Sequence, residues 1–236
     1  FTGHAGALRG FRAYRMTARD ERLSVVVLFN HEGDAHEAAR RVALAAMGKA
    51  DPAPAPIETD WDGLWLDEAR GLRARITTGR SSATLHYATG AETLTASSRD
   101  RLGAPGVTVM REGDALRMER PGENATLSLA PLAEIATADA SAIAGRYVSD
   151  ELEAAMTIEA RDGAAYAVFE GMLGQGRRER LAPLAEDVWS LATRRAMDAP
   201  APGDWTLLVQ RDDAGQVIGA SLGCWLARRV SYRREG

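Results

Sequence analysis

Cysteine and lysine are almost missing from the 236-residue sequence, and each shortage excludes a class of chemistry. Cys224 is the single cysteine, so the chain cannot form an intrachain disulfide and has no cysteine pair to hold a metal. Its apolar neighbours indicate a small core residue. Lys49 is the single lysine, and we expect it at a helix end as a solvated charge, not as the partner of a nucleophile.

Long apolar runs, clustered histidines and a strong net charge are also absent. No apolar run approaches the roughly 18 residues that span a bilayer, and a net charge of −4 offers no basic surface for nucleic acid or an anionic membrane. The four histidines are not spaced as metal ligands, so we expect no histidine metal cluster. No signal peptide opens the sequence, and we expect a cytoplasmic protein. Because the chain opens directly at Phe1, we interpret this start as a cut inside a larger fold, with the true N-terminus out of view.

The composition that is present, 45% hydrophobic and 26% charged, is typical of a globular protein, and three segments can be distinguished. In residues 1–50, the ranges 11–16 and 24–29 are expected to pair as a hairpin. Residues 35–47 are expected to form a helix that Asp34 caps and Gly48 ends. Its predicted apolar face carries Ala38, Val42, Ala45 and Ala46. These elements could hardly bury enough surface to form a domain alone.

Alternating prolines make residues 51–57 an extended linker, and the apolar pattern then changes to a period of two. Short strand candidates separated by turn residues fill residues 58–135 and again 136–236. They include the ranges 72–78, 83–87, 115–120 and 205–211, and none falls between residues 97 and 106. Because closure removes exposed strand edges, we predict two antiparallel β-barrels in tandem. The strings Gly63–Glu68 and Gly145–Asp150 can be superposed as a short repeat. We expect the tryptophans in barrel cores or contacts, and the paired acids Asp67-Glu68, Asp150-Glu151 and Asp212-Asp213 in solvent.

Two places could carry chemistry. In His4-Ala5-Gly6-Ala7 a histidine at a sheet edge could line a cleft, and the Ala7 amide could face an oxyanion. From composition alone, a strand end with glycines for turns is the simpler interpretation. The other place is residues 194–203, a proline-stiffened segment too long for a tight hairpin turn, for which composition favours a plain surface loop.

The strings around these places resemble the bacterial D-aminopeptidase family, from Thr2–Arg12 and Asp20–Ser24 to Met197–Pro200 and Gly223–Arg228. The family comprises serine hydrolases that share a fold with β-lactamases and penicillin-binding proteins. The resemblance implies that residues 1–50 are the C-terminal edge of a β-lactamase-like catalytic domain. A mainly β region would follow, with lipocalin-like barrels at 58–135 and 136–236.

The resemblance also implies roles for single residues. His4 and Gly6 match a His-x-Gly box that forms the wall of the active site, and Ala7 would help to bind the oxyanion. Residues 194–203 match an active-site loop, on which Asp198 would bind the substrate ammonium, flanked by Met197 and Ala199. The loop would also block longer N-terminal extensions.

The implied activity is release of an N-terminal D-amino acid, D-alanine above all, from short peptides, amides or esters through a serine acyl-enzyme. The nucleophilic Ser-x-x-Lys box and the Tyr-x-Asn box are not in this sequence, so the expected partner is an N-terminal catalytic segment that carries them. A homodimer is left open. The alternative is a non-catalytic pair of barrels that acts as a ligand-binding or regulatory module. The large interior residues argue against it, because they would fill a small barrel.

Overall fold

The computed structural model describes residues 1–50, 56–88, 90–192, 203–225 and 227–236. These residues divide into two compact units, one comprising residues 1–50 and the other the described residues from 56 onward. Each unit is considered by itself. The residues 193–202, which include the predicted substrate-binding positions, lie outside the described part of the chain.

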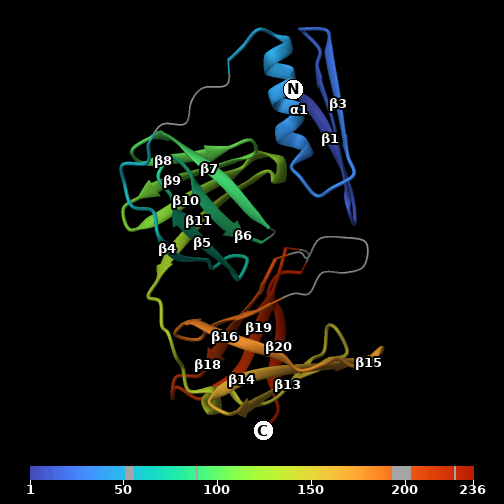
Figure 1. Ribbon diagram of the computed structural model, residues 1–236. Helices are drawn as coiled ribbons and strands as arrows, with labels where there is room; N and C mark the ends of the chain where they lie inside the picture. The colour runs from blue at the N-terminus through green and yellow to red at the C-terminus, as the bar shows by residue number, and fades with distance from the viewer. Residues whose placement is uncertain (51–55, 89, 193–202, 226) are drawn as a thin grey trace. The chain divides into compact units, whose positions relative to one another are not determined.

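The first unit is an antiparallel sheet in the order β1-β2-β3, with one helix packed on it (Figure 1). The strands are β1 (Thr2–Leu8), β2 (Phe11–Ala18) and β3 (Leu23–Phe29), and the helix is α1 (Ala35–Ala46). The helix begins where predicted, because Asp34 Oδ1 accepts a hydrogen bond of 2.9 Å from the Glu37 amide. It ends at Met47, and Gly48 follows with a φ of +68°, a conformation that suits glycine.

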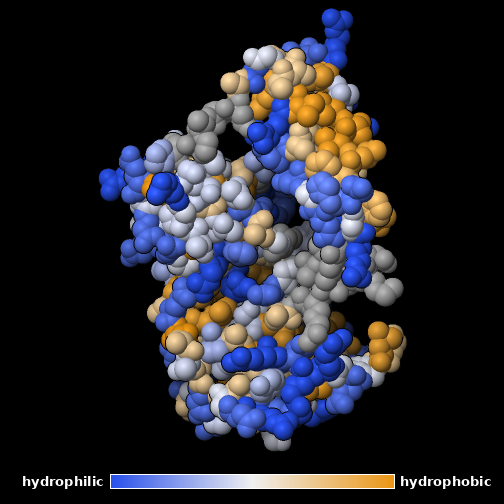
Figure 2. Space-filling view, in the orientation of Figure 1, coloured by the Kyte–Doolittle hydropathy of each residue, from blue (hydrophilic) through white to orange (hydrophobic). Residues whose placement is uncertain are grey.

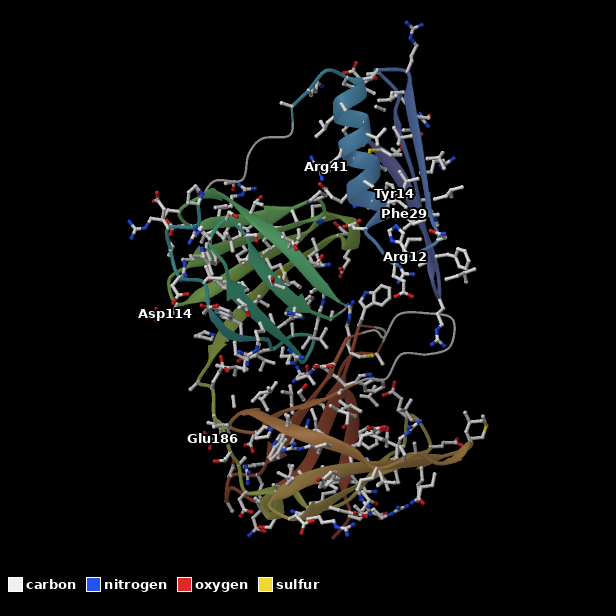
Figure 3. The ribbon with its side chains drawn as sticks, in the orientation of Figure 1. Arg12, Tyr14, Phe29, Arg41, Asp114 and Glu186 are labelled. Carbon is white, nitrogen blue, oxygen red and sulfur yellow. The ribbon has the colours of Figure 1, made fainter. Side chains whose placement is uncertain are left out.

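The two faces of this sheet have different surroundings. On one face, Met16 and Val25 are buried against Ala39 and Ala43 of α1. The ring centroid of Tyr14, which is labelled in Figure 3, lies 4.4 Å from the ring centroid of His36. The predicted helix face was wrong, because Val42 is 51% exposed. An alanine-rich helix offers several small apolar faces, and periodicity alone cannot choose among them.

The opposite face of the sheet is apolar and uncovered within residues 1–50. Strand alternation places Val26 and Leu28 there, 62% and 76% exposed, beside the exposed Leu8 and Phe11. Figure 2 shows these strands as a gathering of hydrophobic side chains. A patch of this kind is typical of a surface that another part of a protein covers.

The second unit begins with a closed barrel in the order β10-β11-β4-β5-β6-β7-β8-β9, with all neighbours antiparallel. Its strands are β4 (Gly63–Asp67), β5 (Leu72–Thr78), β6 (Ala83–Tyr87), β7 (Ala91–Ser98), β8 (Arg101–Ala104), β9 (Val107–Glu112), β10 (Ala115–Arg120) and β11 (Ala125–Leu132). A short 3-10 turn, η1 (Pro121–Glu123), precedes β11. The buried interior residues include Trp61, Trp65, Tyr87 and Met118. Large side chains therefore fill this barrel, as expected from the sequence.

A second antiparallel barrel follows, closed by the pairing of β13 with β14. Its strands are β12 (Gly145–Ser149), β13 (Ala154–Arg161), β14 (Ala164–Gly171), β15 (Gly174–Gln175), β16 (Glu179–Ala185), β17 (Val188–Leu191), β18 (Trp205–Arg211), β19 (Val217–Gly223) and β20 (Val230–Arg234). The 3-10 turn η2 (Ala140–Ile143) leads into it, and β15 extends β14 outside the closed ring. Tyr147, Met156 and Trp189 fill the interior. The protein is therefore mainly β, with two closed antiparallel barrels.

The two barrels contact each other within the second unit. The Ile135 amide, at the end of the segment that follows β11, donates a 3.0 Å hydrogen bond to the Leu184 carbonyl of β16. The preceding residue, Glu134, accepts two hydrogen bonds from Arg75 of the first barrel, at 3.0 and 2.7 Å. Arg229 Nη1 donates to the Glu68 carbonyl at 2.9 Å. A Cβ added at Gly71 would lie 3.0 Å from the Arg229 side chain, so glycine permits this close approach.

The expected positions of Cys224 and the tryptophans are mostly confirmed. Cys224 is 2% exposed and free, and Trp61, Trp65 and Trp189 are buried, whereas Trp225 is 43% exposed. No described helix is long and apolar enough to cross a membrane. The domain limits at 50, 57 and 135 remain predictions, although each strand set falls between them.

Candidate functional site

The predicted wall of the active site lies on β1, an edge strand of the sheet in the first unit. His4 pairs with Arg15, Gly6 with Ala13, and Ala7 with Arg12. Alternation therefore puts His4 and Gly6 on the sheet face away from α1, and Ala7 on the face toward it. Every residue of β1 is exposed. The strand leaves one row of backbone N–H and C=O groups without a neighbouring strand in the described unit, so it could pair with an extended peptide.

The predicted loop joins β17 to β18, but Met197, Asp198 and Ala199 lie outside the described residues. Their roles remain predictions, as do those of His4, Gly6 and Ala7. The residues that follow the loop are described. Asp204 Oδ2 forms a 2.6 Å ion pair with Arg73 Nη2 of the first barrel, and the buried Thr206 Oγ1 accepts a 3.1 Å hydrogen bond from the Arg73 amide.

This Arg73–Asp204 contact joins the first barrel to the end of the predicted loop. The Arg73 side chain is only 14% exposed, and its burial lowers the pKa of the guanidinium, an effect that Asp204 opposes. The sequence analysis missed both residues. Alternating arginines on a strand look like a solvated face, and nothing local marks Arg73 as buried.

Known proteins resemble this chain over most of its length. The family model of D-aminopeptidase, domain B, matches residues 55–233. The chain belongs to the D-aminopeptidase domain B family. It is 54% identical over 233 residues to a protein named D-aminopeptidase from Cereibacter sphaeroides, and 41% identical over 236 residues to one from Brucella ovis. Each alignment covers 99% of this chain and 45% of the relative, so the chain spans less than half the length of these relatives.

In this member of the D-aminopeptidase family, the first barrel also holds a buried polar network at the end of β4. Asp67 is 1% exposed and accepts a 2.7 Å hydrogen bond from the Tyr87 hydroxyl and a 3.1 Å bond from the Arg70 amide. Arg120 lies over the Tyr87 ring and binds both carboxylate oxygens of Glu92. Burial raises the pKa of the Tyr87 hydroxyl, so it remains a hydrogen-bond donor at neutral pH. The prediction that Asp67 is solvated was wrong, because its partner Tyr87 lies 20 residues away in sequence.

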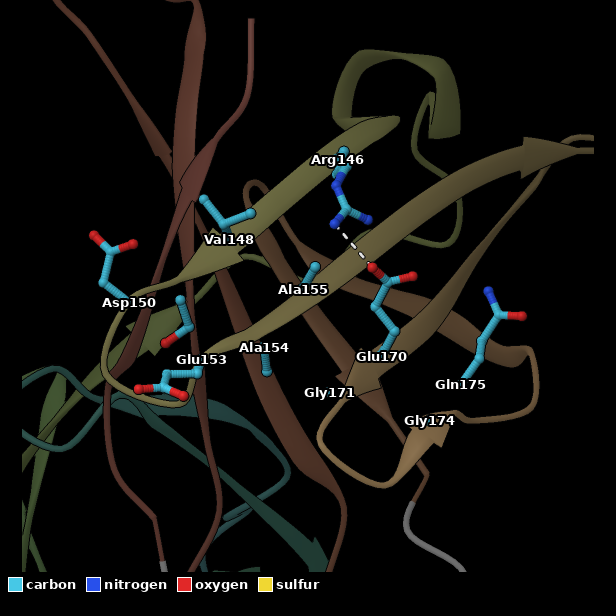
Figure 4. A pocket seen from close by; sticks show the side chains of 11 residues that line it. Arg146, Val148, Asp150, Glu153, Ala154, Ala155, Glu170, Gly171, Gly174 and Gln175 are labelled. Atoms are coloured by element: carbon cyan, nitrogen blue, oxygen red, sulfur yellow. Dashed lines mark hydrogen bonds and ion pairs between the residues drawn. The ribbon is translucent and has the colours of Figure 1, made fainter.

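The second barrel of this family member carries an open hollow on its outer surface. A hollow of about 600 Å³ is formed by residues of β12 to β15 and of the β12–β13 turn (Figure 4). Across the described ranges, no three histidine, cysteine or acidic side chains are placed to hold a metal ion.

Proposed function

We propose that this chain is the C-terminal part of a D-stereospecific aminopeptidase that releases an N-terminal D-amino acid, with D-alanine preferred, from peptides, amides or esters. The observation that carries the proposal is the similarity to proteins named D-aminopeptidase over 99% of the chain. The nucleophile would come from an N-terminal segment related to β-lactamases and penicillin-binding proteins. The apolar sheet face that carries Val26 and Leu28 is uncovered within residues 1–50, which supports such a partner segment. Proteins rarely expose a large apolar patch to water unless another segment or molecule covers it.

In this scheme a serine hydroxyl of the N-terminal segment attacks the scissile carbonyl carbon. A C–O bond forms, the amine leaves with a proton, and water hydrolyses the resulting ester to release the D-amino acid and restore the serine. His4 and Gly6 would shape the wall beside the scissile bond, and the Ala7 amide would donate to the oxyanion. None of these steps requires a metal or an organic cofactor.

Specificity for a free amine would come from Asp198. A carboxylate in a partly dehydrated cleft binds an α-ammonium through a charge-assisted hydrogen bond. The prolines of residues 194–203 would limit the conformations of the loop, and the contact of Asp204 with Arg73 would hold its C-terminal end. The same loop would obstruct substrates that extend beyond the N-terminal residue.

The test is to co-express the chain with the upstream gene segment and to assay D-alanine p-nitroanilide beside its N-acetylated form. We expect activity only from the combined protein. In the full-length protein, Asp198→Ala should lower kcat/KM for the free amine about tenfold to a hundredfold, with little effect on the acetylated substrate.

Asp213→Ala serves as the matched control, because Asp213 is an exposed turn acid of the same barrel. Wild-type discrimination between the two substrates in the Asp198→Ala variant would remove Asp198 from the scheme. A combined protein without activity on D-alanine p-nitroanilide would contradict the aminopeptidase assignment.

A further inference from the structure

Strand β5 of the first barrel carries a buried arginine on its outer side. Leu72, Ala74 and Ile76 point into the first barrel, so strand alternation turns the Arg73 side chain outward. That side chain is nevertheless only 14% exposed. A residue that faces out of one barrel and is still buried must be covered by another element, and its contact with Asp204 identifies that element as the second barrel.

The covered part of the second barrel is the base of the predicted loop, where β17 ends and β18 begins. Ser190 of β17 pairs with Thr206 of β18, and both alternate with residues of the barrel interior, so both face outward. They are buried all the same, with 7% and 1% of their surface exposed. Because the Arg73 amide donates a 3.1 Å hydrogen bond to Thr206 Oγ1, β5 lies over this base.

One carboxylate connects Arg73 to both strands that flank the loop. Asp204 comes immediately before β18, and its Oδ2 lies 2.6 Å from Arg73 Nη2. The same oxygen lies 3.5 Å from Ser190 Oγ of β17, which donates to it. The Arg73 amide can reach Thr206 because β6 pairs with β5 only as far as Ala74. A single arginine of the first barrel is thus tied to the strand that precedes the loop and to the strand that follows it.

The next outward arginine of β5 provides a contrast. Arg75 pairs with Glu134, in the segment that joins the two barrels, and its side chain is 33% exposed. It therefore contacts neither strand that flanks the loop through this pair. A charge-assisted hydrogen bond that is shielded from water holds its groups more firmly than an exposed ion pair does. Arg73 and Arg75 are neighbours of the same type on one strand face, and only Arg73 is tied to the loop base through Asp204.

We propose that Arg73 is a positioning residue of the proposed aminopeptidase, through which the first barrel fixes the loop that presents Asp198 to the substrate ammonium. The inference rests on the proposed function, and it gives the first barrel a task in the selection of substrates with a free amine. Arg73 acts through Asp204 and does not touch the substrate. Hydrogen bonds weaken steeply when their distance and angle change, so a displaced Asp198 carboxylate binds the ammonium less well.

The test compares variants of the full-length protein on D-alanine p-nitroanilide. Arg73→Met should lower kcat/KM about fivefold to tenfold, mainly through a higher KM, whereas Arg75→Met should change it by less than about twofold. Arg73→Lys should restore most of the loss, because a single nitrogen of the Arg73 guanidinium contacts Asp204. Asp204→Asn should reproduce the loss, because it removes the charge at the other end of the ion pair without changing the size of the residue.

The decisive measurement adds Arg73→Met to Asp198→Ala. If Arg73 acts through Asp198, the double variant should have the same kcat/KM as Asp198→Ala alone, because the carboxylate to be positioned is gone. A general structural defect would instead lower kcat/KM by the same factor with and without Asp198. Thermal unfolding of each variant shows that the assay is made on folded protein, and Asp204→Asn replaces Arg73→Met in both comparisons should that variant not fold.

Two results would overturn the inference and leave the aminopeptidase proposal intact. One is an equal kcat/KM for Arg73→Met and Arg75→Met, and the other is the same loss from Arg73→Met in the presence and absence of Asp198. A wild-type full-length protein without activity on D-alanine p-nitroanilide would overturn the aminopeptidase proposal itself, and this inference with it. The two failures are therefore distinguishable by the wild-type assay alone.

Discussion

Asp67 and Ser149 end the first strand of the two barrels, and both are buried, with 1% and 2% of their surface exposed. Each of these strands begins with a glycine and buries an aromatic residue, Trp65 or Tyr147, at its middle position. Asp67 receives hydrogen bonds from Tyr87 and from the Arg70 amide, whereas Ser149 Oγ has no partner among the described residues.

This difference shows that two barrels built on the same strand pattern can differ in how they satisfy the buried polar residue at the strand end. In the first barrel, the polar strand end is satisfied internally, and Arg120 and Glu92 add a salt bridge near it. In the second, Phe169 stands where Tyr87 stands and has no hydroxyl group to donate to the buried Ser149. A satisfied buried network stabilises the fold, whereas a buried hydroxyl group without a partner lowers stability.

The largest expected effect comes from breaking the satisfied network. Asp67→Ala should lower the free energy of unfolding by about 3 kcal/mol, because it leaves the buried Tyr87 hydroxyl and Arg70 amide without an acceptor. Urea denaturation measures this. Asp114→Ala is the control, since Asp114 lies at an exposed turn of the same barrel (Figure 3). A loss no larger than that of the control would mean that the network does not distinguish the barrels.

The next effect concerns the contact between the barrels. Arg73→Met should cost about 1–2 kcal/mol of stability, because it removes a partly buried charge-assisted bond to Asp204. The more exposed pair of Arg75 with Glu134 is the matched control, and Arg75→Met should cost at most about 0.5 kcal/mol. In the proposed enzyme, Arg73→Met should also raise KM for D-alanine p-nitroanilide more than it lowers kcat. Equal effects of the two variants on stability and KM would contradict a special role for Arg73.

Tyr87→Phe should have a smaller effect at neutral pH, about 1 kcal/mol, and a distinct pH dependence. Burial raises the pKa of Tyr87 in the folded protein above its unfolded value, which is about 10. Its stabilising contribution is therefore complete below pH 10 and declines as the pH rises through the folded pKa. Melting temperatures from pH 7 to 11 should fall less steeply in the variant. Parallel curves would show that the Tyr87 proton is not linked to folding.

The smallest effect should have the opposite sign. Ser149→Ala should leave stability unchanged or raise it by up to about 1 kcal/mol, because it removes an unpaired buried hydroxyl. Thr206→Val is the control, since the Thr206 hydroxyl is buried with a partner and its loss should destabilise by about 1 kcal/mol. Thermal unfolding of the two variants distinguishes these outcomes. A clear loss of stability in Ser149→Ala would show that its hydroxyl has a structural role.

Most strands could be predicted because turn residues delimit them. The ranges Leu72–Thr78, Ala83–Tyr87, Ala115–Arg120 and Trp205–Arg211 are observed with the predicted bounds. The four-residue strand β8 was missed, since Gly103 and its short length carry little β signal. The role of His4 and Gly6 comes from resemblance and stays a prediction; the structure shows that both residues are exposed on an edge strand.

By itself, the sequence determined the hairpin and helix of the first unit and the alternation that closes two barrels, because these depend on neighbours close along the chain. Only the tertiary structure decided which alanines of α1 are buried, that Asp67 has Tyr87 as its partner while Ser149 has none among the described residues, and that Arg73 reaches Asp204, 131 residues away. The physical reason is that burial and hydrogen bonding depend on strand register and packing, which bring together residues whose separation in sequence carries no local signal.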